Sequence, residues 1–296
     1  MEFTELASGL AFPEGPVVMP DGSIIVTEIV SGHVTRIWGE GKRELVADTG
    51  GGPAGAAVGP DGALYICNLG GFDLKSMCFG QGPGYEGRIE RIDLSTGKIE
   101  RLYERCGNKL LQAPDDIVFD RQGNMWFTDL GKDFLNDRTY GGLYYASIDG
   151  SSISEVYGRG LSFNGVGLTA GEDMLYVTDT YSARVWRLEI ESPGQARPGP
   201  SGHPGHLHAT IPTGGAIDSM AVLESGKICV AAIHPGGMAV VTEEGAVELI
   251  DLPDDVVTNI AFGGSDMRDA YITLSGTGKL LHCRWPEPGL KLNFSD

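Results

Sequence analysis

The chain has 296 residues, of which 41% are hydrophobic and 21% charged, so it is long enough for one large domain with a substantial core. Its 22 basic and 40 acidic side chains give a net charge of −18, which argues against nucleic acid and membrane surfaces as partners. Five cysteines without a CxxC pair argue against a disulfide framework, and the first residues show no signal-peptide pattern. We therefore expect a cytoplasmic protein whose partner is a small molecule; its oligomeric state is open.

One pattern recurs six times along the chain: a small or polar residue, an apolar run, a glycine-containing turn and a second apolar run. In chain order, the copies are FPEGPVVMPDGSIIVTE (12–28), AGAAVGPDGALYICN (54–68), DDIVFDRQGNMWFTD (115–129), NGVGLTAGEDMLYVTD (164–179), DSMAVLESGKICVAA (218–232) and TNIAFGGSDMRDAYITL (258–274). Further strand pairs, such as GHVTRIW with RELVAD, lie between the copies.

Four strands in each repeat of roughly 40–60 residues are typical of a β-propeller blade. The sequence therefore predicts an all-β fold, a six-bladed β-propeller with four antiparallel strands per blade and a central channel. We expect a single domain over residues 1–296, in which the first residues, near MEFTEL, add an outer strand to the last blade.

The residue eight positions before the turn glycine, or its equivalent, defines one structural position in every blade. Its six members are Glu14, Ala54, Asp115, Asn164, Asp218 and Thr258. The first strand of a blade is the innermost, so we expect these residues to form a ring in the channel. Asp and Asn also begin strands through side-chain turns, which would explain any single member. Carboxylates crowded around an axis repel one another unless a cation lies among them, so a ring in which four of six side chains carry a carboxylate or amide oxygen favours a metal site. Oxygen donors without His or Cys favour Ca²⁺, with Zn²⁺, Mn²⁺ or Mg²⁺ as alternatives.

The loops that follow the second strands should surround the mouth of this channel. Two of them are long, within 68–86 and 129–141, and bring the aromatic side chains of Phe72, Tyr85, Phe134 and Tyr140. Long loops often form lids or pocket walls, so we predict that these four residues bind substrate; surface insertions or subunit contacts are the alternative. His234 follows the fifth second strand and is a further candidate, although a lone histidine is more often structural.

The segments FPEGPVV, PDDIVFD, FNGVGL, IDSMAV and VTNIAFGG resemble the senescence-marker-protein/gluconolactonase/regucalcin family in order and spacing across nearly the whole chain. The resemblance implies a divalent cation in the channel, usually Ca²⁺, and lactone hydrolysis. It assigns Glu14, Asn164 and Asp218 to the metal. Asp115-Asp116 stands where the family usually has Asn-Asp, Ala113 where sugar-lactone members often have Arg, and Ser219 where Gly is usual. This combination looks closer to the drug-responsive lactonase branch.

The leading functional hypothesis is a metal-dependent hydrolase that opens a lactone. Glu14, Asn164, Asp218 and Asp115 would hold the cation, Asp218 or Asp115 would act as the general base on water, and Asp116 would contact the substrate. The absence of a Gly-x-Ser-x-Gly motif argues against a serine hydrolase. Two alternatives stay open: a phosphotriesterase-like hydrolase, lyase or isomerase using the same metal, and a non-catalytic calcium-binding propeller.

Overall fold

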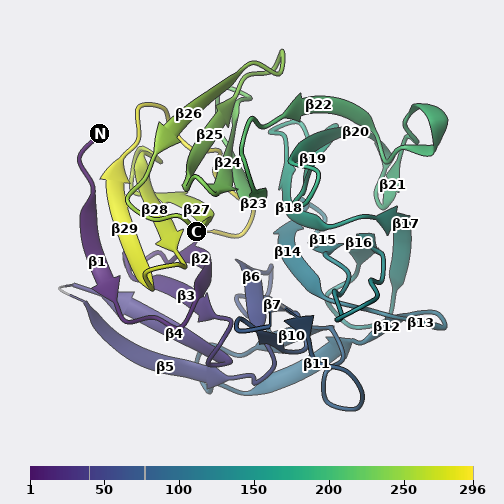
Figure 1. Ribbon diagram of the computed structural model, residues 1–296. Coiled ribbons are helices and arrows are strands. Elements are labelled where there is room, and N and C mark those ends of the chain that lie inside the picture. Colours follow the sequence, from purple (N-terminus) through teal and green to yellow (C-terminus); the bar gives the residue numbers. More distant parts are fainter. Residues whose placement is uncertain (40, 77, 296) are drawn as a thin grey trace.

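The computed structural model describes residues 1–39, 41–76 and 78–295, which form six antiparallel sheets around a central axis (Figure 1). Each sheet is one blade, so the predicted all-β, six-bladed propeller is confirmed. The short apolar runs of the repeat explain this outcome, because each supplies a strand of a sheet that is buried on both faces.

The blades follow one another along the chain, and each begins with its innermost strand. Blade 1 consists of β2 (Pro13–Val18), β3 (Ile24–Glu28), β4 (His33–Trp38) and β5 (Lys42–Asp48). Blade 2 consists of β6 (Pro53–Val58), β7 (Leu64–Asn68), β10 (Arg88–Ile92) and β11 (Ile99–Tyr103). Blade 3 consists of β14 (Pro114–Phe119), β15 (Met125–Asp129), β16 (Gly141–Ala146) and β17 (Ile153–Gly160).

The second half of the ring repeats this arrangement. Blade 4 consists of β18 (Phe163–Leu168), β19 (Met174–Asp179), β20 (Arg184–Ser192) and β22 (His206–Thr210). Blade 5 consists of β23 (Ala216–Val222), β24 (Ile228–Ile233), β25 (Gly237–Val241) and β26 (Val247–Asp251). Blade 6 consists of β27 (Val257–Gly263), β28 (Asp269–Leu274), β29 (Lys279–Arg284) and β1 (Thr4–Ser8).

Short elements decorate this frame. The loop between β7 and β10 carries the hairpin β8 (Phe72–Asp73) and β9 (Cys78–Phe79), and a second hairpin joins β12 (Arg105–Cys106) to β13 (Lys109–Leu110). Strand β21 (Gln195–Ala196) pairs with β20, and a 3₁₀ turn, η1, spans Pro200–Gly202. Among the residues described, no helix is long and apolar enough to cross a membrane.

Both ends of the chain help to close the ring. Strand β1 pairs with β29, with Thr4 opposite His282, so the first strand of the chain is the outer strand of the last blade. The C-terminal segment returns toward the axis, where Leu290 donates its amide to Val222 O (2.9 Å) and the side chain of Asn293 donates to Phe119 O (2.9 Å). Figure 1 shows the N-terminus at the rim and the C-terminus near the centre.

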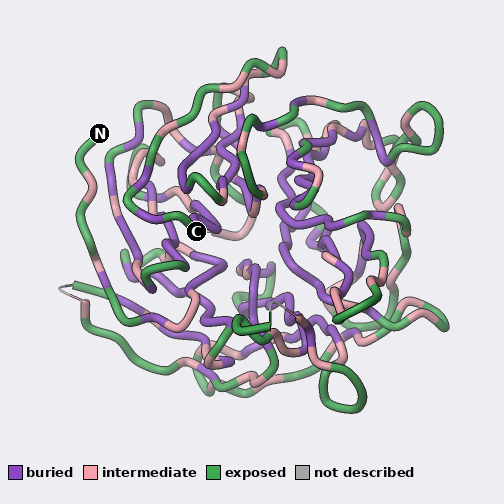
Figure 2. The backbone as a smooth tube through the Cα atoms, in the orientation of Figure 1, coloured by how far each residue is buried: buried purple, intermediate pink, exposed green. Residues whose placement is uncertain are grey.

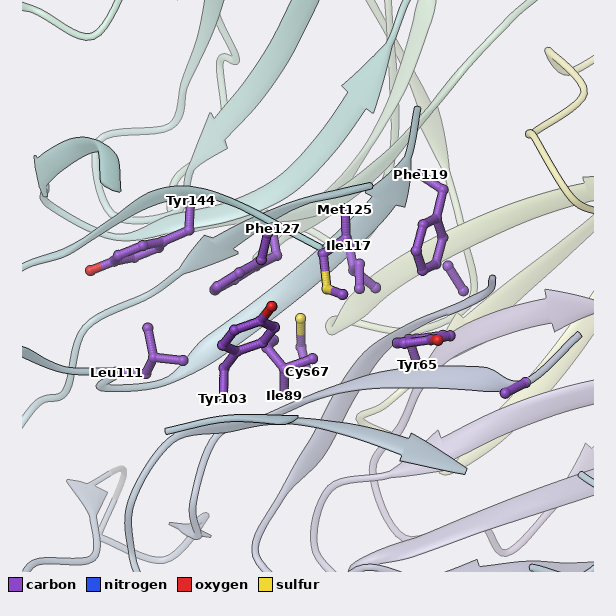
Figure 3. Packing of buried hydrophobic residues seen from close by; sticks show 13 residues of the cluster. Tyr65, Cys67, Ile89, Tyr103, Leu111, Ile117, Phe119, Met125, Phe127 and Tyr144 are labelled. Atoms are coloured by element: carbon purple, nitrogen blue, oxygen red, sulfur yellow. The ribbon is translucent and has the colours of Figure 1, made fainter. Parts of the chain in front are cut away.

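Six apolar clusters fill the six interfaces between neighbouring blades. Figure 3 shows the cluster between blades 2 and 3, where the rings of Phe127 and Tyr144 stack with centroids 5.2 Å apart. Figure 2 shows that burial is concentrated along the inner strands, whereas the outer strands expose much of their length. Apolar burial between blades is the main stabilising contribution in such a ring.

Every inner strand is irregular at the same place. The register of the pairing with the second strand shifts at the predicted ring residue or directly after it, as between Glu14 and Val17 in blade 1. Glycine is required at two of these register shifts because the inner strands approach closely. A Cβ on Gly15, whose φ is +47°, would lie 2.3 Å from Ala54 O, and one on Gly55 would lie 2.6 Å from the Cα of Asp116.

A belt of three threonines ties the second strands of blades 1, 3 and 4 to the blades that follow them. Thr27, Thr128 and Thr178 are fully buried next-to-last residues of β3, β15 and β19. Their hydroxyls donate to the carbonyls of Ala54 (2.6 Å), Asn164 and Asp218 (2.8 Å). Each of these carbonyls belongs to the ring residue of the following blade, so the belt fixes where the ring residues stand.

Candidate functional site: a ring of acidic residues at the channel mouth

The structure places the six ring residues at equivalent positions of their blades. In every blade, the residue directly before the ring residue pairs with a residue near the end of the second strand, as in Pro13 with Glu28 and Pro114 with Asp129. The same pairing precedes the other four members, Ala54, Asn164, Asp218 and Thr258. The extra turn residues of the fourth and sixth copies of the repeat therefore do not disturb the register of the inner strand.

The carboxylates of the ring influence one another through the low-dielectric interior. Burial raises the pKa of Glu14 well above its ordinary value, and the charges of Asp218 and Asp116 raise it further. Burial also raises the pKa of Asp115, followed by the charges of Asp218 and Glu14. For Asp218, burial raises the pKa to about 7, although hydrogen bonds from Asn164 and the amide of Ser219 oppose the shift. The fold therefore gathers three acidic groups whose simultaneous ionisation is unfavourable.

Glu14 carries the clearest sign of a missing ligand. Its side chain is 2% exposed, and its Oε2 accepts hydrogen bonds from Asn259 Nδ2 (2.9 Å) and from the amide of Gly15. Its Oε1 is also buried but has no hydrogen-bond partner among the residues described. A buried carboxylate oxygen without a donor is costly, and a cation would satisfy it.

The ring is not a finished metal shell. Within the described ranges, no group of three or more His, Cys, Asp or Glu side chains is placed to hold a metal ion. The residues available are oxygen donors: the carboxylates of Glu14, Asp115 and Asp218 and the amide of Asn164. This donor set fits a hard divalent cation, and metal binding itself stays a prediction.

A second layer of polar residues, one position further along the inner strands, orients the ring. Asn259 holds Glu14, as described above, and the hydroxyl of Ser219 donates to Asn164 Oδ1 (3.0 Å). Asp116 accepts the amides of Ile117 (2.9 Å) and Val166 (3.2 Å), and burial raises its pKa to about 7. Asp116 therefore lies in this second layer, where backbone donors engage both of its oxygens, and its predicted contact with substrate is untested.

Four polar residues close to the ring have a different role, and we call them the clamp residues. They are the last residues of the second strands in blades 1 to 4: Glu28, Asn68, Asp129 and Asp179. Each holds the chain that leads into the inner strand of its own blade. Asp129, for example, accepts the amides of Gln112 (2.7 Å), Ala113 (2.9 Å) and Gly131 (2.9 Å).

The long loops bring two of the predicted aromatic residues together. Phe72 and Phe134 both pack against a buried apolar cluster that contains Ala54, the ring residue of blade 2. The rings of Phe72 and Phe79 lie 5.0 Å apart between centroids. One sector of the mouth is therefore apolar, between the sectors that carry Glu14 and Asp115.

Polar contacts join the mouth loops of blades 2, 3 and 4 into one wall. Lys132 is buried and donates its ammonium to Tyr85 O, and Phe79 donates its amide to Asp133 O (3.0 Å). Asp133 in turn accepts the hydroxyl of Tyr181 (2.6 Å) and pairs with Arg138. Burial lowers the pKa of Lys132 to about 8, although Asp129 and Glu86 oppose the shift.

The other candidates are more exposed. Tyr85 and Tyr140 are 47% and 60% exposed on the two long loops. His234 is exposed beside a cis peptide bond to Pro235, and its amide donates to Asp255 O (3.0 Å). These positions agree with the predicted mouth loops, and contact with substrate stays a prediction for all three.

A cavity of about 110 Å³ lies along the axis next to the ring, lined by residues that follow the ring residues in the inner strands. Gly15, Asp116 and Asn259 lie among its lining residues, together with aliphatic side chains of all six inner strands. Leu290, Leu292, Asn293 and Ser295 of the C-terminal segment also line it. The sequence did not indicate this C-terminal contribution, because the segment lies outside the repeat.

Two further features were missed at the sequence level although the repeat contains their signal. Asn259 and Ser219 each follow a ring residue directly, and the belt threonines recur in IIVTE, MWFTD and LYVTD. Alignment of the copies by these positions would have found both sets.

Comparison with known proteins agrees with the fold. The family profile described as "SMP-30/Gluconolactonase/LRE-like region" matches residues 12–276. Lactonase drp35 of Staphylococcus haemolyticus is 29% identical over 183 residues, which are 61% of this chain and 52% of that protein. Lactonase drp35 of Staphylococcus aureus (strain MRSA252) is 30% identical over 179 residues, 58% of this chain and 49% of the relative. The matched region thus spans about half the length of these curated relatives.

Solved structures share the architecture at low sequence identity. A gluconolactonase from Xanthomonas campestris superposes with a TM-score of 0.76 at 20% identity, covering 96% of this chain and 89% of that one. A calcium-binding protein, regucalcin, from Agrobacterium tumefaciens gives a TM-score of 0.73 at 15% identity, with coverage of 96% and 95%. At these identities the likeness shows the fold.

Proposed function

The chain belongs to the SMP-30/gluconolactonase/LRE-like family, and from this premise we propose that it is a divalent-cation-dependent hydrolase that opens lactones. The observation that carries the proposal is the buried, unpartnered Oε1 of Glu14 in a ring with Asp115 and Asp218. The lactonase relatives support the reaction class. Glu14, Asn164, Asp218 and Asp115 would hold the cation, for which Ca²⁺ is the first choice. When bound, the cation supplies Lewis-acid stabilisation of the negative charge that grows on the carbonyl oxygen.

Asp218 is the general base in this proposal. It is partly exposed, whereas Glu14, Asp115 and Asn164 are buried, so water reaches Asp218 most easily. Water attacks the carbonyl carbon while Asp218 accepts one of its protons. The ring C–O bond then breaks, and the ring oxygen takes that proton to give a hydroxy acid. Asn164 and the amide of Ser219 hold the Asp218 carboxylate for this transfer.

The apolar sector of the mouth supports a less polar substrate than a sugar lactone. Phe72 and Phe134 pack beside Ala54 and Ala113, and neither alanine can donate a hydrogen bond from its side chain to a sugar hydroxyl. We infer that the apolar substituent of the lactone lies over blade 2, with the ester group over the carboxylates.

The proposal is tested with aliphatic, aromatic and sugar lactones, on chelator-treated protein supplied with Ca²⁺, Mn²⁺, Zn²⁺ or Mg²⁺. Proton release should follow addition of a lactone and a cation, and aliphatic or aromatic lactones should exceed sugar lactones in kcat/KM. The Glu14→Gln variant is the matched control and should need much more cation. Absence of turnover with every lactone and cation would overturn the hydrolase proposal. Full turnover without a cation would overturn the metal requirement alone.

A further inference from the structure

One position at the channel mouth is equivalent in all six blades and lies just beyond the threonine belt. Its members are Ile29, Leu69, Leu130, Thr180, Ile233 and Ser275. In five blades, its amide donates to the residue that precedes the inner strand, as in Leu69 to Gly52 O (2.8 Å) and Thr180 to Ser162 O (2.9 Å). In blade 5, Ile233 pairs with Ala216, which occupies the position equivalent to Gly52 and Ser162 in the other blades. We call this position the mouth position.

In blades 1 and 6, the side chain at the mouth position contacts the inner strand of the following blade. Ile29 belongs to the buried cluster that contains Ala54, the ring residue of blade 2. Ser275 donates its hydroxyl to Pro13 O (2.6 Å), directly before Glu14. For Thr180 the inner strand of the following blade is β23. The carbonyl of Thr180 accepts the amide of Ile217 (3.3 Å), the residue directly before Asp218. Thr180 therefore lies beside the start of β23, next to the proposed general base.

Thr180 differs from its five equivalents. Four of them are Ile or Leu, and the hydroxyl of Ser275 is satisfied by Pro13 and Thr258. Thr180 is only 8% exposed, and its Oγ1 has no hydrogen-bond partner among the described residues. Its own backbone is fully used, because the amide donates to Ser162 and the carbonyl accepts from Ile217 and Ala183. A buried hydroxyl left without a partner is unfavourable, and a molecule bound beside Asp218 would supply the hydrogen bond that Thr180 lacks.

We propose that the hydroxyl of Thr180 holds the water molecule that attacks the lactone carbonyl. This inference rests on the proposed lactonase function. Asp218 accepts one proton of the water, and Thr180 Oγ1 accepts a hydrogen bond from the other O–H. Two acceptors on different residues fix the direction of the oxygen lone pair, which neither can do alone. The oxygen then forms the new bond to the carbonyl carbon as the transferred proton moves to Asp218, and the second proton stays on the product acid.

The same turn contains a natural control. The described residues hold two other unpartnered hydroxyl or indole groups in blade 4, Ser182 Oγ and Trp186 Nε1. Trp186 packs in the cluster between blades 3 and 4 and stacks on His203, away from the ring. Ser182 lies in the turn that leads into β20, so removal of its hydroxyl should leave turnover unchanged.

The experiment compares wild-type protein with Thr180→Val, Thr180→Ser and Ser182→Ala on the best lactone of the panel, with saturating Ca²⁺. Thr180→Val keeps the shape of the side chain and removes its hydroxyl. We expect a loss of about tenfold or more in kcat with KM within about twofold, the size of one lost hydrogen bond in the transition state. Thr180→Ser restores most of kcat, and Ser182→Ala equals the wild type. The Ca²⁺ concentration for half-maximal thermal stabilisation should be the same in all four proteins.

Several results would overturn the assignment while the lactonase proposal survives. One is a Thr180→Val variant that turns over like the wild type. Another is a variant with raised KM and normal kcat, which would place the hydroxyl on the bound substrate rather than on the water. A Thr180→Ser variant as slow as Thr180→Val, with unchanged thermal stability, would also contradict it. A wild-type protein without lactone turnover would instead overturn both proposals.

Discussion

The ring residues begin the first strands of the blades, and the clamp residues end the second strands beside them. The protein nevertheless satisfies the hydrogen-bonding groups of these two sets very differently. Asp129, a clamp residue, accepts three backbone amides, and Glu28 accepts the amide of Ala11 (2.7 Å) and the hydroxyl of Thr35 (2.5 Å). Glu14, a ring residue, keeps a buried oxygen for which the described part of the chain offers no donor. Burial raises the pKa of Asp129, and hydrogen bonds from backbone amides oppose this rise. Burial also raises the pKa of Asp115, but there the charges of neighbouring carboxylates raise it further.

This difference separates structural acids from functional ones. A carboxylate saturated by backbone donors contributes to folding and has no capacity left for a ligand. A carboxylate that is buried, crowded by like charges and under-saturated costs stability, which is typical of a site that awaits a partner. Removal of a clamp acid should therefore damage the fold, and removal of a ring acid should damage activity.

Asp218→Asn should show the largest functional effect. We expect kcat/KM to fall about 10³-fold, because the general base is lost. The free energy of unfolding of the metal-free protein should not fall, because Asp218 raises the pKa of both Glu14 and Asp115 through its charge. Steady-state kinetics and urea denaturation in chelator measure the two quantities. Turnover at the wild-type rate would remove Asp218 from the mechanism.

Asp129→Ala should show the reverse pattern. The amides of Gln112, Ala113 and Gly131 lose their acceptor, so we expect a loss of about 3 kcal/mol in the free energy of unfolding. Urea denaturation measures it, and Asp129→Asn, which keeps one acceptor oxygen, is the matched control with a smaller loss. An unchanged urea midpoint for Asp129→Ala would show that the clamp residues do not support the fold.

Lys132 adds a pH-dependent test of the clamp region. Its folded-state pKa of about 8 lies below the ordinary 10.5, because the ammonium is buried. Between these values the folded protein loses the proton first, so stability should rise with pH from about 8 to 10.5 and should show no Lys132 contribution to the slope below 8. We expect Lys132→Met to lose about 1 kcal/mol of that rise by pH 9. Urea denaturation between pH 7 and pH 10 measures the difference, and parallel curves for the two proteins would contradict it.

Tyr140→Ala should show the smallest effect. The side chain is 60% exposed, so the free energy of unfolding should change by about 0.5 kcal/mol or less. If Tyr140 lines the mouth as the sequence predicts, KM should rise about threefold with kcat unchanged. Phe134→Ala, on the same loop, should destabilise the protein more because Phe134 packs against the cluster around Ala54. A KM equal to that of the wild type would contradict the predicted contact between Tyr140 and the substrate.

The repeat made the fold and the ring positions predictable from the sequence. Its turn glycines and apolar runs define the strands, and one offset locates Glu14 and Asp218 in the same register. The hydrogen-bond partners of each carboxylate were not predictable, because they depend on contacts between different blades. Asn259 reaches Glu14 across 245 positions of sequence, and Thr180 is recognised as unusual only by comparison with its structural equivalents Ile29 and Ser275.

The most direct test of the account is the metal content of the folded protein, measured by mass spectrometry after dialysis against Ca²⁺ and removal of free ions. We predict one divalent ion per chain in the wild type and in Asp129→Asn, and much less than one in Glu14→Gln and Asp218→Asn. A wild-type protein without bound metal, or an ion that persists in both ring variants, would contradict the claim that the under-saturated acids of the ring are the functional ones.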